Sequence, residues 1–217
     1  MLFGKEANQS INGGQGIGFA GRAAWNTQTD STLYHAGLAA MWLEPPSTED
    51  DTFRYRVRPE SHVTGVRLVD TTITQASSST SLGIEVAARW GGLSAQAEFI
   101  SVDVDQAAAG VSDPGFSGYY AHVSWFPGGE FRPYKNGAFG RAKAVRAWEF
   151  GVRFSTIDLD DGVFNGGVEK NLTLGVNYYV NPQLRFMVNY IRADIENGIN
   201  GDETPNIFQI RASMDFK

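Results

Sequence analysis

The chain has 217 residues, a formal net charge of -6 and a pI near 5.1, which argues against a general nucleic-acid binder and makes its arginines a local feature. Cysteine is absent, so disulfide frameworks and thiolate metal sites are excluded. No run of about 18 or more apolar residues is present, which excludes a transmembrane helix, and the first residues lack the basic and apolar regions of a signal peptide.

Alternation of apolar and polar residues predicts about ten strands, and no segment shows convincing helical periodicity. The predicted strands are typically about ten residues long, which exceeds the usual ~5–6 of soluble strands and matches the ~9–11 needed to cross a bilayer at a tilt. In chain order they lie near residues 17–26, 33–43, 53–60, 80–90, 93–104, 117–126, 147–157, 171–180, 183–193 and 207–216.

The third of these strands carries an arginine at every second position: Arg54, Arg56 and Arg58. In a strand these side chains share one face, and residues 53, 55 and 57 share the other. We expect the aromatic and aliphatic face to contact lipid or packed protein and the arginines to face water inside a barrel. The alternative is an exposed edge strand whose charges prevent aggregation, a role that more often uses lysine.

The predicted connections alternate in length. Gly91-Gly92 and Asn181-Pro182 are tight turns, whereas 105–116, 158–170 and 194–206 are long. Short turns at one end and long loops at the other are typical of an outer-membrane barrel. A soluble β-sandwich would also alternate, but the polar face here is dominated by Gly, Asn, Ser and Arg, and the tryptophans near strand ends fit interfacial girdles.

Three local patterns suggest chemistry that their context does not support. The stretch GIGFAG at 16–21 matches a dinucleotide motif, but a strand follows it where a helix is needed. The stretch DLDDG at 158–162 lacks the glutamate and helices of a calcium loop, so an acidic external loop is the better interpretation. His35, His62 and His122 have no metal-ligand spacing. We therefore predict no enzyme, no cofactor and no metal, with a barrel-borne hydrolase as the form of enzyme to check.

A basic segment at 127–148 carries Arg132, Lys135, Arg141, Lys143 and Arg146 against a single acid, Glu130. A solvated loop is one interpretation. The other is a segment folded into or across a pore mouth, where its charges concentrate anions.

Several ordered stretches resemble the phosphate-selective porin O and porin P family of Gram-negative outer membranes. They are FRYRVRPESH, GIEVAARWGGLSAQAEF, GYYAHVSWFPGGEFRPYKNGAFGR, AWEFGVRFSTIDLDDG, NLTLGVNYYVNPQLRFMVNYI and the terminal FQIRASMDF. The resemblance implies a single antiparallel transmembrane β-barrel domain over residues 1–217, corresponding to the C-terminal ten or so strands of a sixteen-stranded, trimeric barrel. We expect an N-terminally truncated chain whose strands either close as a smaller barrel or leave two open edges.

In that family an inward-facing arginine ladder leads anions to a narrow eyelet. The resemblance assigns the ladder to Arg54, Arg56 and Arg58, with His62 and Arg67 as the nearest eyelet candidates. It implies passive diffusion of anions, above all phosphate or polyphosphate, across the outer membrane. It also implies a homotrimer in contact with outer-membrane lipid and lipopolysaccharide, and no nucleic acid. The alternative is a non-selective or adhesive structural barrel.

Overall fold

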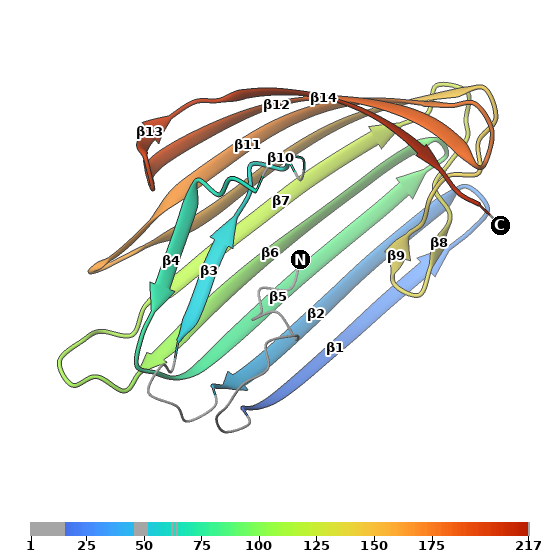
Figure 1. Ribbon diagram of the computed structural model, residues 1–217. Helices are drawn as coiled ribbons and strands as arrows, with labels where there is room; N and C mark the ends of the chain where they lie inside the picture. Colours follow the sequence, from blue (N-terminus) through green and yellow to red (C-terminus); the bar gives the residue numbers. More distant parts are fainter. Residues whose placement is uncertain (1–15, 46–51, 62, 64, 217) are drawn as a thin grey trace.

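The computed structural model describes residues 16–45, 52–61, 63 and 65–216. Its main feature is a ten-stranded antiparallel sheet that curves into an open trough (Figure 1). Its strands are β1 Ile17–Gln28, β2 Thr32–Glu44, β5 Ala76–Trp90, β6 Leu93–Gln106, β7 Gly115–Trp125, β10 Ala147–Asp161, β11 Phe164–Tyr179, β12 Leu184–Gly198, β13 Gly201–Glu203 and β14 Asn206–Met214. Within the described part of the chain, β1 and β14 each pair on one side only, so the sheet is open.

Two small hairpins lie apart from this sheet. The first pairs β3 (Phe53–Val57) with β4 (Val69–Ile73), and the second pairs β8 (Tyr134–Lys135) with β9 (Ala138–Phe139). Both lie in the hollow of the trough (Figure 1). The predicted strand near 53–60 is therefore an element inside the trough and not part of its wall.

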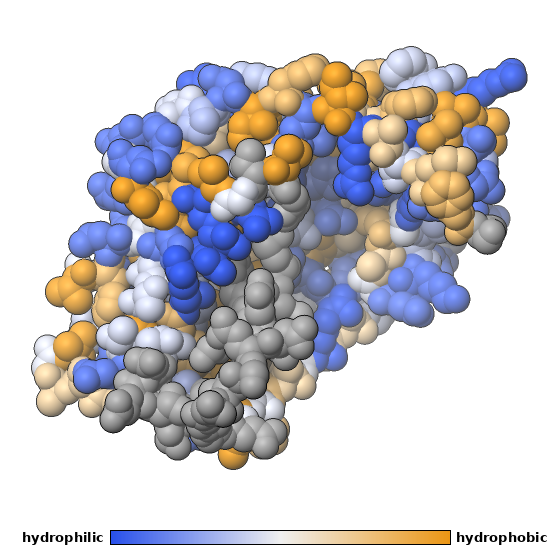
Figure 2. All heavy atoms as spheres, viewed as in Figure 1, coloured by the Kyte–Doolittle hydropathy of each residue, from blue (hydrophilic) through white to orange (hydrophobic). Residues whose placement is uncertain are grey.

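The wall is inside out compared with a soluble protein. On β10, Trp148, Phe150, Val152 and Phe154 are exposed on the outer face, whereas Glu149 points inward and is buried. Strands β5, β7, β11 and β12 repeat this alternation, and Figure 2, which views the hollow, shows hydrophilic side chains gathered around it. An apolar outer face with a polar interior is the arrangement of a transmembrane β-barrel wall, and it confirms the predicted fold class.

The apolar outer belt ends before the strands do. On β10 and β11 the belt covers Trp148–Phe154 and Leu172–Tyr178; beyond it the outward residues are charged, as at Asp158 and Lys170. The Lys170 Nζ lies 2.6 Å from Glu196 Oε1 on the outer surface. We call the strand portions beyond the belt the extension. Its outer face carries charged residues and is suited to contact with water.

Within the extension the alternation is reversed, because apolar side chains now point inward. Ile157, Leu159 and Ile195 are buried against the β3–β4 hairpin, together with Val69 and Phe116. This reversal explains why the predicted long connection at 158–170 is wrong. The strands continue to a two-residue turn at Gly162 and Val163, since the inward face still has a core to cover.

No helix long and apolar enough to span a membrane occurs in the portion of the chain described above.

Candidate functional site

The β3–β4 hairpin carries the predicted arginine ladder into the trough. Arg54 forms a bidentate ion pair with Asp70, which stands opposite Arg56 in the hairpin; Nε lies 2.7 Å from Oδ1 and Nη2 2.5 Å from Oδ2. Such fork-to-carboxylate pairing uses two of the guanidinium's five donors and offsets its charge. Arg54 therefore has less free charge to offer than its sequence position suggests.

The opposite face of β3 packs on the inner wall. Tyr55 is 5% exposed, its ring lies 5.4 Å from that of Phe116, and its hydroxyl hydrogen-bonds Ser79 at 2.8 Å. Phe53 and Val57 pack against the same cluster. Of the two surroundings that the sequence allowed for this face, packed protein is the one observed and lipid is not.

Arg56 and Arg58 line a cavity of about 280 Å³ between the hairpin and the inner wall. The cavity is bordered by the hairpin, the segment that follows β3, and wall strands β6, β7, β10 and β11. Its charged lining residues are Arg56, Arg58, Arg67, Arg153, Glu60, Glu98 and Glu169. Four cations and three carboxyl groups thus line one cavity, and the net balance favours an anion.

Glu60 fixes the segment after β3 to the far side of the trough. Its Oε1 accepts hydrogen bonds from Arg153 Nε and Ser155 Oγ, both at 2.6 Å, and its Oε2 accepts one from Thr173 Oγ1 at 2.5 Å. The backbone at Glu60 has a positive φ of 50°, a conformation that costs free energy unless its surroundings hold it. Three wall contacts supply that restraint, so Glu60 sets where the arginines stand.

Arg153 is held on two sides, since its guanidinium also lies 3.9 Å from the centre of the Tyr120 ring. The Tyr120 hydroxyl accepts a hydrogen bond from Gln96 at 3.0 Å. Further along, Gln209 of β14 hydrogen-bonds the hydroxyl of Ser61. The segment therefore contacts the inner wall from β10 to β14.

The second inward segment, residues 126–146, joins β7 to β10 and contains the predicted basic cluster. Arg132 Nε lies 2.6 Å from Glu149 Oε1, and Glu149 is only 1% exposed. The other oxygen of Glu149 accepts hydrogen bonds from Asn177 at 2.8 Å and from the Tyr179 hydroxyl at 2.7 Å. Arg132 thus neutralises a buried carboxylate and is not a free cation.

The remaining members of the cluster separate into two kinds. Arg141 forms an ion pair with Asp215 and donates to the Gln183 carbonyl at 2.8 Å. Lys135 and Lys143 are exposed. Of the four predicted residues, Arg132 and Arg141 are therefore ion-paired, with Glu149 and Asp215, whereas Lys135 and Lys143 face solvent.

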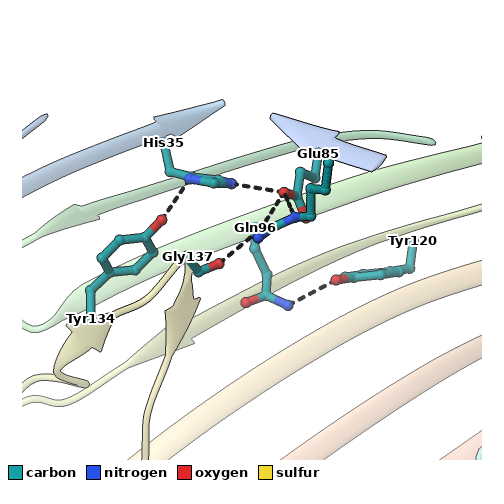
Figure 3. Close-up of polar contacts among 7 residues, drawn as sticks. His35, Glu85, Gln96, Tyr120, Tyr134 and Gly137 are labelled. Atoms are coloured by element: carbon teal, nitrogen blue, oxygen red, sulfur yellow. Dashed lines mark hydrogen bonds and ion pairs between the residues drawn. The ribbon is translucent and has the colours of Figure 1, made fainter. Parts of the chain in front are cut away.

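A polar network holds the β8–β9 hairpin against β1, β2 and β5 (Figure 3). The Tyr134 hydroxyl lies 2.5 Å from His35 Nδ1, and His35 Nε2 lies 3.2 Å from Glu85. Arg22 donates to Glu85 at 2.7 Å and to the Gly137 carbonyl at 3.2 Å. Gly137 has a φ of 82°, and a Cβ there would lie 2.8 Å from Arg22. His35 therefore serves as a structural contact in this network.

The DLDDG stretch closes the extension and does not form the external loop that the sequence predicted. Asp160 accepts hydrogen bonds from the Gly167 backbone at 2.7 Å and from Asn197 at 3.0 Å. Asp161 accepts one from the Gly115 backbone at 2.7 Å. Among the residues that the structure describes, no group of three or more His, Asp or Glu side chains could hold a metal ion.

Of the two eyelet candidates, Arg67 lines the cavity and His62 lies outside the described residues. Sequence reasoning missed Glu60, Arg153 and Glu169, which stand far apart in the chain and carry no shared motif. Only the topology brings them together.

The outward apolar belt, the charged interior and the segments folded into the hollow together define a porin-type membrane barrel. The sequence model of the family described as phosphate-selective porin O and P matches residues 1–216, so the chain belongs to that family. It is 28% identical over 215 residues to an uncharacterized protein of Caulobacter vibrioides, covering 92% of this chain and 43% of that protein. It is also 28% identical over 151 residues to Porin O of Pseudomonas aeruginosa, covering 62% of this chain and 34% of that porin. The chain spans less than half the length of these curated relatives.

Proposed function

We propose that this chain forms part of an outer-membrane porin through which anions, most readily phosphate or polyphosphate, diffuse passively. The observation that carries the proposal is the cavity inside the trough, where Arg56, Arg58 and Arg67 from the inward-folded segment converge with Arg153 from the wall. Membership of the phosphate-selective porin O and P family and the likeness to Porin O support it. A homotrimer in contact with outer-membrane lipid and lipopolysaccharide is part of the same proposal.

The physical mechanism is stepwise replacement of the anion's hydration shell. Each guanidinium presents a planar fork that matches two oxygens of a phosphate, whereas a lysine acts as a point charge. Alternate strand residues stand ~6.6–6.8 Å apart, so an anion passes from one fork to the next without a site that holds it too tightly. We assign most of this role to Arg56 and Arg58, which line the cavity, whereas Arg54 is paired with Asp70.

The second inward segment has a smaller part in the proposal. Since Arg132 and Arg141 are paired with Glu149 and Asp215, they hold that segment in place. Lys135 and Lys143 are exposed and add a diffuse positive potential at this end of the trough.

Planar-bilayer recording of the complete protein tests the function. Replacing both Arg56→Ala and Arg58→Ala is expected to raise the phosphate concentration needed to block chloride current by about tenfold or more, since each lost charge-assisted hydrogen bond is worth about 1.5–3 kcal/mol. Arg54→Ala is expected to have a smaller effect because of Asp70. Arg192→Ala, on the exposed outer face of β12, is the matched control and should leave block unchanged.

Two results would refute the proposal: a current carried mainly by cations, or phosphate block that survives the double replacement intact. The first would point to a non-selective or adhesive barrel, which is the competing interpretation of the sequence.

A further inference from the structure

One carboxyl group in the anion cavity is not explained by the pairing of charges there. Glu169, on β11, is 0% exposed and lines the cavity. Its Oε1 accepts a hydrogen bond from Asn171 Nδ2 at 2.7 Å, but its Oε2 has no partner among the residues that the structure describes. Leaving a buried carboxyl oxygen unsatisfied costs free energy, so such a group usually indicates a missing ligand or a functional role.

A second acceptor beside it is also unsatisfied. Asn171 Oδ1, next to Glu169 in the cavity wall, has no hydrogen-bond partner within the described part of the chain. Because Asn171 already donates through its nitrogen to Glu169, its free atom is the acceptor. The lining of the cavity therefore combines arginine donors with two residues that each carry a buried, unpaired acceptor.

That combination selects a particular kind of anion. Arginine forks need oxygens that accept hydrogen bonds, and any oxyanion has these. The free acceptors need a ligand that also donates, which means an oxyanion carrying its own hydroxyl. Inorganic phosphate keeps at least one proton near neutral pH, whereas sulfate carries none. Sites with buried acceptors reject ligands that leave those acceptors unpaired.

We propose that Glu169 is a specificity-determining residue that favours hydroxyl-bearing oxyanions such as phosphate over fully deprotonated ones such as sulfate. The inference rests on the proposed function, because it assumes that anions enter this cavity. The arginines recognise the oxygens of any oxyanion, whereas Glu169 would recognise whether the anion carries a hydroxyl group.

The protonation of Glu169 gives the selectivity a pH dependence. Glu169 lies on the extension, beyond the Leu172–Tyr178 belt of β11. Burial raises the pKa of Glu169 to about 7; the Asn171 hydrogen bond lowers it, and the nearby charge of Glu60 raises it. The other charged groups around the cavity are Arg56, Arg58, Arg67 and Arg153 on the cationic side and Glu98 on β6, with the Tyr120 phenol on β7.

The direction of the dependence follows from what each form can do. Below about pH 7 the carboxyl group is protonated and donates to any oxyanion, so phosphate and sulfate are treated alike. Above it the carboxylate accepts a hydrogen bond from phosphate and repels sulfate. Discrimination therefore increases as the pH rises through about 7.

The test compares phosphate and sulfate block of chloride current through the complete protein in planar bilayers at pH 6 and pH 8. The ratio of the sulfate to the phosphate concentration that blocks half the current is expected to rise by about tenfold, the equivalent of roughly 1.4 kcal/mol. In Glu169→Gln the rise should shrink to the part that the titration of phosphate itself causes, because the amide both donates and accepts at every pH. Glu196→Gln, a carboxylate on the outer face paired with Lys170, is the control and should keep the wild-type rise.

A measurement on the unaltered protein tests the inference even if the Glu169→Gln variant does not fold. Arsenate, which carries a hydroxyl, is expected to behave like phosphate at pH 8, and selenate, which does not, like sulfate. If both block equally, or if Glu169→Gln keeps the full wild-type rise, the inference is refuted. The proposed function would survive that result as long as the Arg56 and Arg58 replacements still weaken phosphate block; it fails separately if the wild-type current is not carried by anions.

Discussion

The same strands are built in opposite ways in the belt and in the extension. On β12, Phe186, Val188 and Tyr190 face outward in the belt, whereas Ile191 and Ile195 face inward in the extension. Side chains point alternately outward and inward along the whole strand. What changes is that the apolar residues occupy the outward positions in the belt and the inward positions in the extension. The difference shows that the apolar face follows the apolar surroundings, which are the bilayer outside the belt and the β3–β4 hairpin inside the extension.

The interiors differ accordingly. Inside the belt the trough holds hydrogen-bonded polar groups, including Glu149 with Arg132 and Glu85 with Arg22. Inside the extension it holds an apolar cluster, with the arginine-lined cavity where that cluster meets the polar interior. The strand that carries the arginine ladder therefore packs on an apolar core like that of a water-soluble protein.

The largest expected effect concerns that core. Ile195→Ala removes a fully buried side chain from the extension and should lower the free energy of unfolding by about 2–5 kcal/mol, because it leaves a cavity. Urea unfolding of the protein folded into lipid vesicles measures it. Glu196→Ala, the next residue on the outer face, should cost less than roughly 1 kcal/mol. Equal costs for the two would mean that the extension has no such core.

A charge on the outer face distinguishes the two regions next. Val152→Arg, near the middle of the belt on β10, should cost about 2–4 kcal/mol if this face contacts hydrocarbon. Ser117→Arg, on the outer face of β7 in the extension and paired across the sheet with Asp158, should cost roughly 0–1 kcal/mol. The same vesicle experiment compares them, and a tolerated arginine at position 152 would contradict the assignment of the belt.

The smallest effect separates exposed lysines from cavity arginines. Replacing Lys135→Ala and Lys143→Ala together should change phosphate block less than twofold or so, since solvent-exposed charges act through screened, long-range attraction. Single-channel recording at two salt concentrations checks this. If phosphate block fell as much as with the Arg56 and Arg58 replacements, the main anion site would have to be assigned to the β8–β9 end of the trough.

The sequence predicted the wall well because alternation and turn chemistry are local properties. The tight turns at Gly91-Gly92 and Asn181-Pro182 and nine of the predicted strands lie in the sheet. The long connection at 158–170 was wrong since the change from apolar to charged outward residues, as at Asp158 and Lys170, was read as the end of the strand. The change marks the end of the belt.

The contents of the trough could not be predicted in the same way. Alternation in β3 shows which residues share a face, but it does not show what each face contacts. The basic residues of 127–148 are visible in the sequence, yet Arg132 pairs with Glu149 on β10 and Arg141 with Asp215, just beyond β14. Glu60 and Glu169 carry no local signal, because their roles arise from burial and from contacts across the sheet.

The height of the extension has a consequence for the reach of the arginines. Since these strand portions stand beyond the apolar belt, the cavity beside them contacts the surrounding electrolyte and not hydrocarbon. The distance over which its positive charge is felt is then set by the surrounding medium, from about 8 Å at physiological ionic strength to about 30 Å at 0.01 M. In dilute water the guanidinium groups would attract scarce anions from several molecular diameters away, and in brine they would act only on those that touch them.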